Sequence, residues 1–151
     1  MKMKYVIIII AVILLLSIGF FVYENYSNQN TIKVDNAIFA MPEGFHFAGD
    51  AKDLTITDGS SSIGFLSHDG KNLTKHVNEY IKLKKKDNFS THIENFTVND
   101  VFVSKSNVVG DNKTVHYWFV GKDKVYEIFT RDANSNTENI IKDIISSVKY
   151  S

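Results

Sequence analysis

The chain of 151 residues contains no cysteine. This absence excludes disulfide bonds, thiolate nucleophiles, zinc–thiolate sites, iron–sulfur clusters and a lipid-modified N-terminal cysteine. Arginine occurs once, at position 131, against 16 lysines, so bidentate recognition of phosphate or carboxylate has a single candidate side chain. A domain of roughly 120 residues can bury a sufficient core without disulfides. The lack of cysteine therefore does not argue against export.

The chain also lacks net charge, because its 17 basic and 17 acidic side chains balance. A neutral domain has no broad positive field to attract nucleic acid, so we expect no nucleic-acid partner. Glycine-rich phosphate loops, a G-x-S-x-G nucleophile turn and the calcium-loop ligand pattern are all missing from the sequence. We therefore predict no catalytic residue and no cofactor-binding residue.

Five histidines are scattered along the chain without the spacing of a metal site. His68 and His76, which flank Asp69, come nearest to one, but an ordinary loop and helix-surface location is the better interpretation. His116 lies beside Trp118 in a strand pattern and is expected to be a partly buried structural residue. The sequence thus predicts no metal site.

A long apolar run opens the chain. From Tyr5 to Tyr23 there are 19 residues without a charge, and a helix of that length would be roughly 28 Å long, close to the hydrocarbon thickness of a bilayer. The run has no polar stripe of the kind seen in helices of water-soluble cores. Lys2 and Lys4 precede it, so the positive-inside rule places the N-terminus in the cytoplasm and the remainder outside. We expect residues 5–23 to hold the chain in a membrane.

A cleaved export signal is the alternative for this segment. Ser17-Ile18-Gly19 offers a small-x-small cleavage site after an apolar stretch. The apolar run continues through residues 20–22, however, and cleavage there would leave an apolar new N-terminus. The sequence favours an uncleaved single-pass signal anchor over residues 1–23, with secretion after cleavage near Gly19 as the alternative.

The remainder divides into a polar tether, residues 24–35, and an extracytoplasmic domain, residues 36–151. Within the domain, short apolar runs alternate with turn signals such as Asp58-Gly59 and Asn99-Asp100. These patterns predict strands at 37–41, 53–57, 62–67, 91–98, 101–106, 114–120 and 124–130.

Two amphipathic helices are predicted among these strands. The first begins after Asn72, a suitable N-cap, and continues to the lysines near position 86. The second follows Ser135 and Glu138, which fit a capping box, and carries a dense apolar face over residues 140–148. That face needs a sheet to cover it. The fold class is therefore α+β: a mainly antiparallel sheet with two packed helices, preceded by one N-terminal transmembrane helix.

This element order, together with several short strings, resembles the PsbP-like class over roughly residues 37–150. The strings are Met41-Pro42-Glu43-Gly44-Phe45, the lysine-rich stretch 81–86, the turn Asn99-Asp100, the strand Lys124–Ile128 and the ending Ser147-Val148-Lys149-Tyr150. The chain is also similar to small membrane-anchored proteins of methanogenic archaea whose roles are unassigned. The resemblance implies a non-enzymatic accessory or binding module, often membrane-associated, and it carries over no binding residue.

Three groups of side chains are candidates for surface or core roles. The first helix has a lysine-rich face, comprising Lys75, Lys82, Lys84, Lys85 and Lys86. Such a face is usually only solvated, but it could contact anionic headgroups, an acidic envelope polymer or a membrane-protein partner.

Glycosylation sequons occur at Asn25, Asn72, Asn88, Asn95 and Asn112. The aromatic residues of the two strongest strands, Tyr117, Trp118, Phe119, Tyr126 and Phe129, are expected to fill a core, with a ligand groove as the alternative.

The sequence therefore predicts a membrane-anchored extracytoplasmic accessory or binding module that is not an enzyme. One alternative is an interaction domain that docks on a membrane complex through the lysine-rich helix face. Another is an envelope enzyme with an unrecognised acid and histidine site, which would require such side chains to converge in a pocket.

Overall fold

The computed structural model describes residues 12–18, 30–48 and 53–151. Residues 12–18 form a helix whose side chains are all exposed. The other residues of the predicted anchor, and residues 24–29 of the predicted tether, lie outside the described ranges. Within those ranges, no helix has the length and apolar character needed to cross a membrane.

A seven-stranded sheet is the centre of the folded domain, and every neighbouring pair in it is antiparallel. In spatial order its strands are β3 (His46–Phe47), β4 (Leu54–Thr57), β5 (Ser62–Asp69), β9 (Lys124–Thr130), β8 (Val115–Gly121), β7 (Val101–Val108) and β6 (Thr91–Val98). Strand β8 lies between β9 and β7 and is covered on both faces, as its bulky alternating residues indicate.

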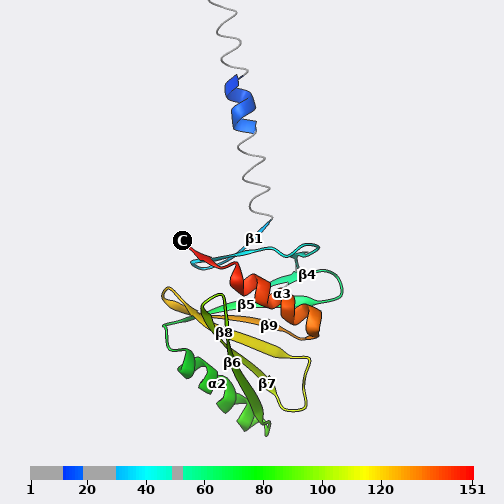
Figure 1. Ribbon diagram of the computed structural model, residues 1–151, viewed down its shortest axis with the longest axis vertical. Coiled ribbons are helices and arrows are strands. Elements are labelled where there is room, and N and C mark those ends of the chain that lie inside the picture. Colours follow the sequence, from blue (N-terminus) through cyan, green and yellow to red (C-terminus); the bar gives the residue numbers. More distant parts are fainter. Residues whose placement is uncertain (1–11, 19–29, 49–52) are drawn as a thin grey trace, which may run out of the picture.

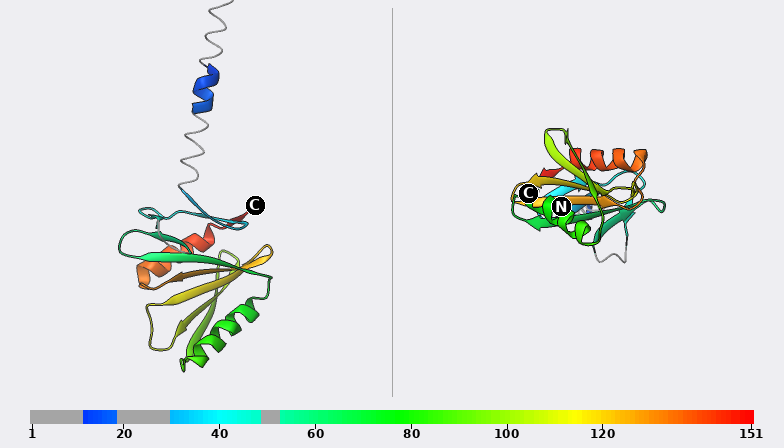
Figure 2. Two further views of the ribbon diagram at one scale, coloured as in Figure 1. Left: turned by 180° about the vertical axis from the view of Figure 1, so that it is seen from behind. Right: turned by 90° about the horizontal axis from the view of Figure 1, so that it is seen from below.

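Different elements cover the two faces of this sheet (Figures 1 and 2). Helix α3 (Ser135–Ser146) lies on one face, together with a second, three-stranded sheet of β1 (Thr31–Val34), β2 (Ala37–Ala40) and β10 (Lys149–Tyr150). Helix α2 (Leu73–Lys86) packs on the opposite face, over β8, β7 and β6. The fold is thus α+β with two packed helices, as the sequence predicts.

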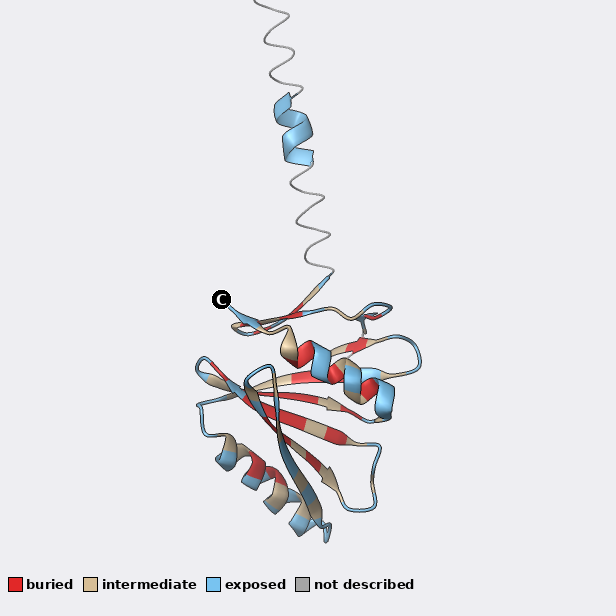
Figure 3. Cartoon of the chain, viewed as in Figure 1, coloured by how far each residue is buried: buried red, intermediate tan, exposed pale blue. Residues whose placement is uncertain are grey.

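The larger core lies between the seven-stranded sheet and α3 (Figure 3). Ile141, Ile144 and Ile145 of α3 are buried in it against strand residues such as Tyr117 and Phe119. The strand residues that alternate with Tyr117 and Phe119 face α2 instead, and together with side chains of α2 they form a smaller hydrophobic cluster. The five aromatic residues that the sequence predicts to fill a core lie in these layers. All of them are buried except Phe129, which is half-buried.

Two predicted turns and one predicted cap are confirmed. Residues 58–61, which begin with Asp58-Gly59, join β4 to β5, with Gly59 at φ 91°. Asn99 and Asp100 join β6 to β7 with φ values of 43° and 65°, the two left-handed residues of a type I′ turn. The side chain of Asn72 accepts a hydrogen bond from the backbone N–H of Lys75 at 2.9 Å and caps α2.

Three boundaries differ from the sequence prediction. The folded part begins at Thr31 rather than 36, because Ile32 and Val34 are buried in β1. Asn134, rather than Ser135, caps α3, since its side chain accepts from the N–H of Thr137 at 3.0 Å. The helix ends at Ser146, and the last residues form β10, which pairs with β2.

Candidate functional site

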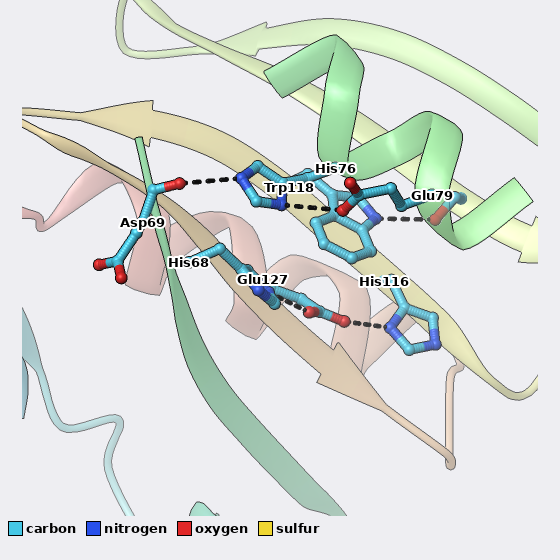
Figure 4. A network of polar contacts seen from close by, with 8 residues as sticks. His68, Asp69, His76, Glu79, His116, Trp118 and Glu127 are labelled. Carbon is cyan, nitrogen blue, oxygen red and sulfur yellow. Dashed lines mark hydrogen bonds and ion pairs between the residues drawn. The ribbon is translucent and has the colours of Figure 1, made fainter. Parts of the chain in front are cut away.

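The most unusual chemistry of the described residues lies on the sheet face beneath α2, where a glutamate sits between two histidines (Figure 4). Glu127 on β9 is opposite Leu66 of β5 and Trp118 of β8. His68 and His116 stand two residues from those partners on the same face, so they are diagonal neighbours of Glu127. Strand register thus places three polar side chains, distant in sequence, in one row.

Each carboxylate oxygen of Glu127 contacts one histidine. The distance from Oε2 to Nε2 of His68 is 2.7 Å, and that from Oε1 to Nδ1 of His116 is 2.6 Å. The Glu127 side chain is 6% exposed. Burial raises the pKa of the Glu127 carboxyl, but the hydrogen bonds and charges of His116 and His68 outweigh burial and leave this pKa below its ordinary value.

Aromatic rings cover this row. Tyr80 of α2 lies over His116 with ring centroids 4.9 Å apart and over Trp118 at 5.9 Å. His76 of α2 lies 5.1 Å from the ring of His68. Trp118 donates from Nε1 to the hydroxyl of Ser106 at 2.9 Å. The rings of His68, His116 and Trp118 therefore form an aromatic layer against which α2 packs.

Phe129 extends this aromatic layer over β5. Its ring lies where a Cβ of Gly64 would be, with the nearest ring carbon 2.3 Å from that position. Only glycine fits there, so the ring of Phe129 can lie flat across the neighbouring strand. The same ring stacks on His116 at 5.7 Å.

The chemistry open to this row is limited. Both oxygens of Glu127 already accept hydrogen bonds, and the group is shielded from water. Across residues 12–18, 30–48 and 53–151, no group of three or more potential ligands is arranged to hold a metal ion. The arrangement fits a polar contact that fixes ring orientations better than it fits an acid–base pair awaiting a substrate.

The rings of His68 and His76 approach each other, whereas the carboxylate of Asp69 contacts neither ring. The Asp69 carboxylate pairs with Lys124 at 2.7 Å, and Lys124 also lies 3.4 Å from Asp35. His76 contacts the backbone oxygen of Asp69 at 3.2 Å and the carboxylate of Glu79 at 3.6 Å (Figure 4). These contacts do not form a ligand set: His68 belongs to the aromatic layer beneath α2, and His76 packs on it from α2.

Sequence reasoning missed Glu127 as a member of this site. One signal was present: the alternation of β9 places this carboxylate on the same face as Val125 and Phe129. A buried acid on an apolar face requires a partner. Its partners, His68 and His116, could not be selected among five histidines without the strand order.

The candidate lysines lie on the outer side of α2. Lys82, Lys85 and Lys86 are exposed and form no ion pair with any described residue. Lys75 lies 4.0 Å from Glu79, and Lys84 lies over the Tyr80 ring at 5.6 Å. Figure 1 shows α2 at the end of the domain opposite β1, so this face is far from the point where the chain enters the domain.

Four of the five sequon asparagines are described, and all four are exposed: Asn72, Asn88, Asn95 and Asn112. Asn72 is engaged as the cap of α2, and the Asn95 side chain accepts from the hydroxyl of Ser104 at 2.8 Å. Asn25 lies outside the described residues. Glycosylation at these positions stays a prediction.

The sequence matches no family model, and no curated protein matches it. Its structure is similar to the solution structure of cyanobacterial PsbP (CyanoP) from Synechocystis sp. PCC 6803, with a TM-score of 0.50 over 78% of this chain and 88% of that chain, at 12% sequence identity. The fold is PsbP-like. A crystal structure from Bacteroides thetaiotaomicron is also similar, with a TM-score of 0.45 over 82% of this chain and 49% of that chain, at 8% identity. At such identities the PsbP-like fold carries no site residue over to this chain.

Proposed function

We propose that the chain is a membrane-anchored module that works outside the cytoplasm and acts by binding a partner rather than by catalysis. The observation that carries the proposal is the 19-residue uncharged run ahead of a PsbP-like domain. An uncharged stretch of this length is typical of a bilayer-spanning helix. The lysines before the run favour a cytoplasmic N-terminus. The resemblance to small membrane-anchored archaeal proteins is consistent with the same placement.

The burial and hydrogen bonding of the polar side chains beneath α2 support a binding role rather than a catalytic one. An acid catalyst needs a proton it can deliver to a substrate, and a base needs a free lone pair facing one. Glu127 is enclosed and holds both histidines. An envelope enzyme built on this row would first have to move α2 away from it, since Tyr80 and His76 cover the histidine rings.

Fractionation of cells tests the anchor. We expect the intact chain in the membrane pellet after washing at alkaline pH, because about 20 apolar residues hold a helix in the bilayer without protein contacts. A matched variant without residues 5–23 should leave the pellet. An intact chain found only in the cytosolic fraction, with no membrane-bound or exported pool, would overturn the proposal, and a shortened exported chain would support cleavage near Gly19.

The second candidate is docking on a membrane complex through the lysine-rich face of α2. The side chains of Lys82, Lys85 and Lys86 favour it, because they are exposed and form no ion pair within the described part of the chain, and exposed cations can attract an acidic partner at little desolvation cost. Leu83, which lies between these lysines in sequence, and Phe89, which follows Lys86 by three residues, are 55% and 53% exposed and add apolar surface. The position of α2 opposite β1 favours an acidic protein or polymer over the headgroups next to the anchor.

A further inference from the structure

The seven-stranded sheet has one long free edge. Strand β6 is the last in the order and, among the strands of the described residues, pairs only with β7, through eight consecutive residue pairs without a bulge. The opposite edge strand, β3, has only two residues. Exposed edges are usually protected by short strands, prolines, charged side chains or bulges, and β6 has only one of these devices, the exposed side chain of Glu94.

The hairpin geometry identifies which backbone groups of β6 are free. Residues that flank a two-residue turn form a hydrogen-bonded pair, so Val98 pairs its N–H and C=O with Val101. Alternate residues then point their backbone groups away from β7. These are Thr91, Ile93, Asn95 and Thr97, and none of them forms a backbone hydrogen bond with another described residue outside the β6–β7 ladder.

A groove adjoins this edge on each face of the sheet. On the α2 side a groove of about 320 Å³ is lined mainly by apolar side chains, including Val77, Ile81 and Ile93. On the α3 side a groove of about 380 Å³ is lined by two lysines and two glutamates, Lys105, Lys142, Glu94 and Glu138. A strand added beside β6 would direct alternate side chains toward these two grooves.

The charges differ between the grooves. On the α3 side, Lys105 is already paired with Glu138 at 3.0 Å and lies 3.9 Å from Glu94, so both glutamates of that groove have a cation beside them. Lys142 has no carboxylate partner among the described residues, and its Nζ lies 5.4 Å from the centre of the Phe96 ring. The α3 side therefore offers a free cation, and the α2 side offers apolar surface.

We infer that β6 is a docking edge for an extended segment of a partner protein in which apolar residues alternate with acidic ones. The added strand would bond to the outward backbone groups of β6, place apolar side chains in the α2-side groove and direct a carboxylate toward Lys142. This inference deepens the proposed binding role and depends on it.

A defined peptide tests the edge with the full chain in phosphatidylcholine nanodiscs. The probe is a fluorescein-labelled peptide of about eight residues in which valine alternates with glutamate, and the comparison peptide has the same composition in two blocks. Anisotropy should show the alternating peptide binding about tenfold more tightly than the block peptide, because only the former matches both grooves.

Matched variants separate backbone pairing from general attraction. Thr97→Pro removes one outward N–H and should weaken binding about tenfold, whereas Thr97→Val keeps that N–H and should change it by less than about twofold. Lys142→Glu should reverse the preference toward a peptide in which valine alternates with lysine. If Thr97→Pro does not fold, N-methylation of the peptide at the alternate residues that face β6 makes the same test.

Several results would overturn the inference. These are equal binding of the alternating and block peptides, no binding of either, and binding that Thr97→Pro and N-methylation leave unchanged. Self-association of the chain that Thr97→Pro abolishes would assign the edge to a second copy instead. Any of these results leaves the membrane fractionation unaffected, so failure of the edge is distinguishable from failure of the proposed function.

Discussion

At the scale of single residues, Glu127 organises the α2 side of the sheet. It holds His68 and His116 by one oxygen each, and α2 rests on those rings through His76 and Tyr80. A side chain that is buried and bonded at both oxygens fixes its neighbours more strongly than it attracts a ligand. The site is therefore expected to contribute to stability and to the position of α2.

Replacement of this carboxylate tests that role. Glu127→Gln should lower the free energy of unfolding by about 1–3 kcal/mol at pH 7, since an amide cannot accept from both histidines. Urea unfolding, followed by the emission of Trp118, measures the change, because Trp118 is the only tryptophan and lies in the site. Glu43→Gln on the exposed surface is the control and should leave stability unchanged.

The loss of stability in Glu127→Gln should also depend on pH. The pKa of Glu127 is lower in the folded chain than its ordinary value, so its stabilisation is present above the unfolded pKa of about 4.3 and is lost as the pH falls through the folded pKa. The difference in stability between wild type and Glu127→Gln should therefore shrink below about pH 4. A difference that is zero at pH 7, or that grows on acidification, would contradict the role assigned to Glu127.

At the scale of elements, α2 has two distinct faces. Val77 and Tyr80 are buried against the sheet, while Lys82, Lys85 and Lys86 point to solvent. Because the lysines make no ion pair with any residue in the described ranges, they can be changed without disturbing the inner face. This separation allows the lysine-rich face to be tested as a contact surface.

Charge reversal of Lys82, Lys85 and Lys86 to Glu tests the docking candidate. If the face is a contact surface, pull-down from detergent-solubilised membranes should lose the partner, because an attractive surface becomes repulsive to an acidic one. The control carries the same change of net charge at exposed lysines elsewhere: Lys33, Lys113 and Lys149. Recovery of the same partners with both variants would contradict a role for this face.

Elements with strong local signals were predictable from the sequence. The type I′ turn at Asn99-Asp100, the cap at Asn72 and the alternation of β8 each depend on neighbouring residues only. Strands β3 and β10 have two residues each, too few to show a period, and exist through pairing with distant strands. The cap of α3 was misplaced by one residue because Asn134 and Ser135 are both good N-cap residues.

At the scale of the whole molecule, the strand order determines which side chains from distant parts of the sequence come together. Local sequence patterns do not reveal that order. Pairing of β5 with β9 brings His68 within 2.7 Å of Glu127, although 59 residues separate them. The sequence predicts the α+β class but contains no rule that places β9 between β5 and β8. The candidate site was therefore unpredictable as a unit, while each of its strands was predictable.

The arrangement of the whole domain also orients its surfaces. The chain enters at β1, and α2 lies at the opposite end of the domain (Figure 1). If residues 5–23 are anchored, α2 would face away from that end. Membrane placement is thus the claim on which the choice of partners depends.

Accessibility of single cysteines tests that placement most directly, because the natural chain has no cysteine to interfere. Intact cells carrying Lys113→Cys or Lys2→Cys are treated with a membrane-impermeant maleimide. We expect the cysteine at position 113 to be labelled in intact cells and the cysteine at position 2 to be labelled only after the cells are broken. Labelling at position 113 that also requires broken cells would place the domain in the cytoplasm and contradict the account.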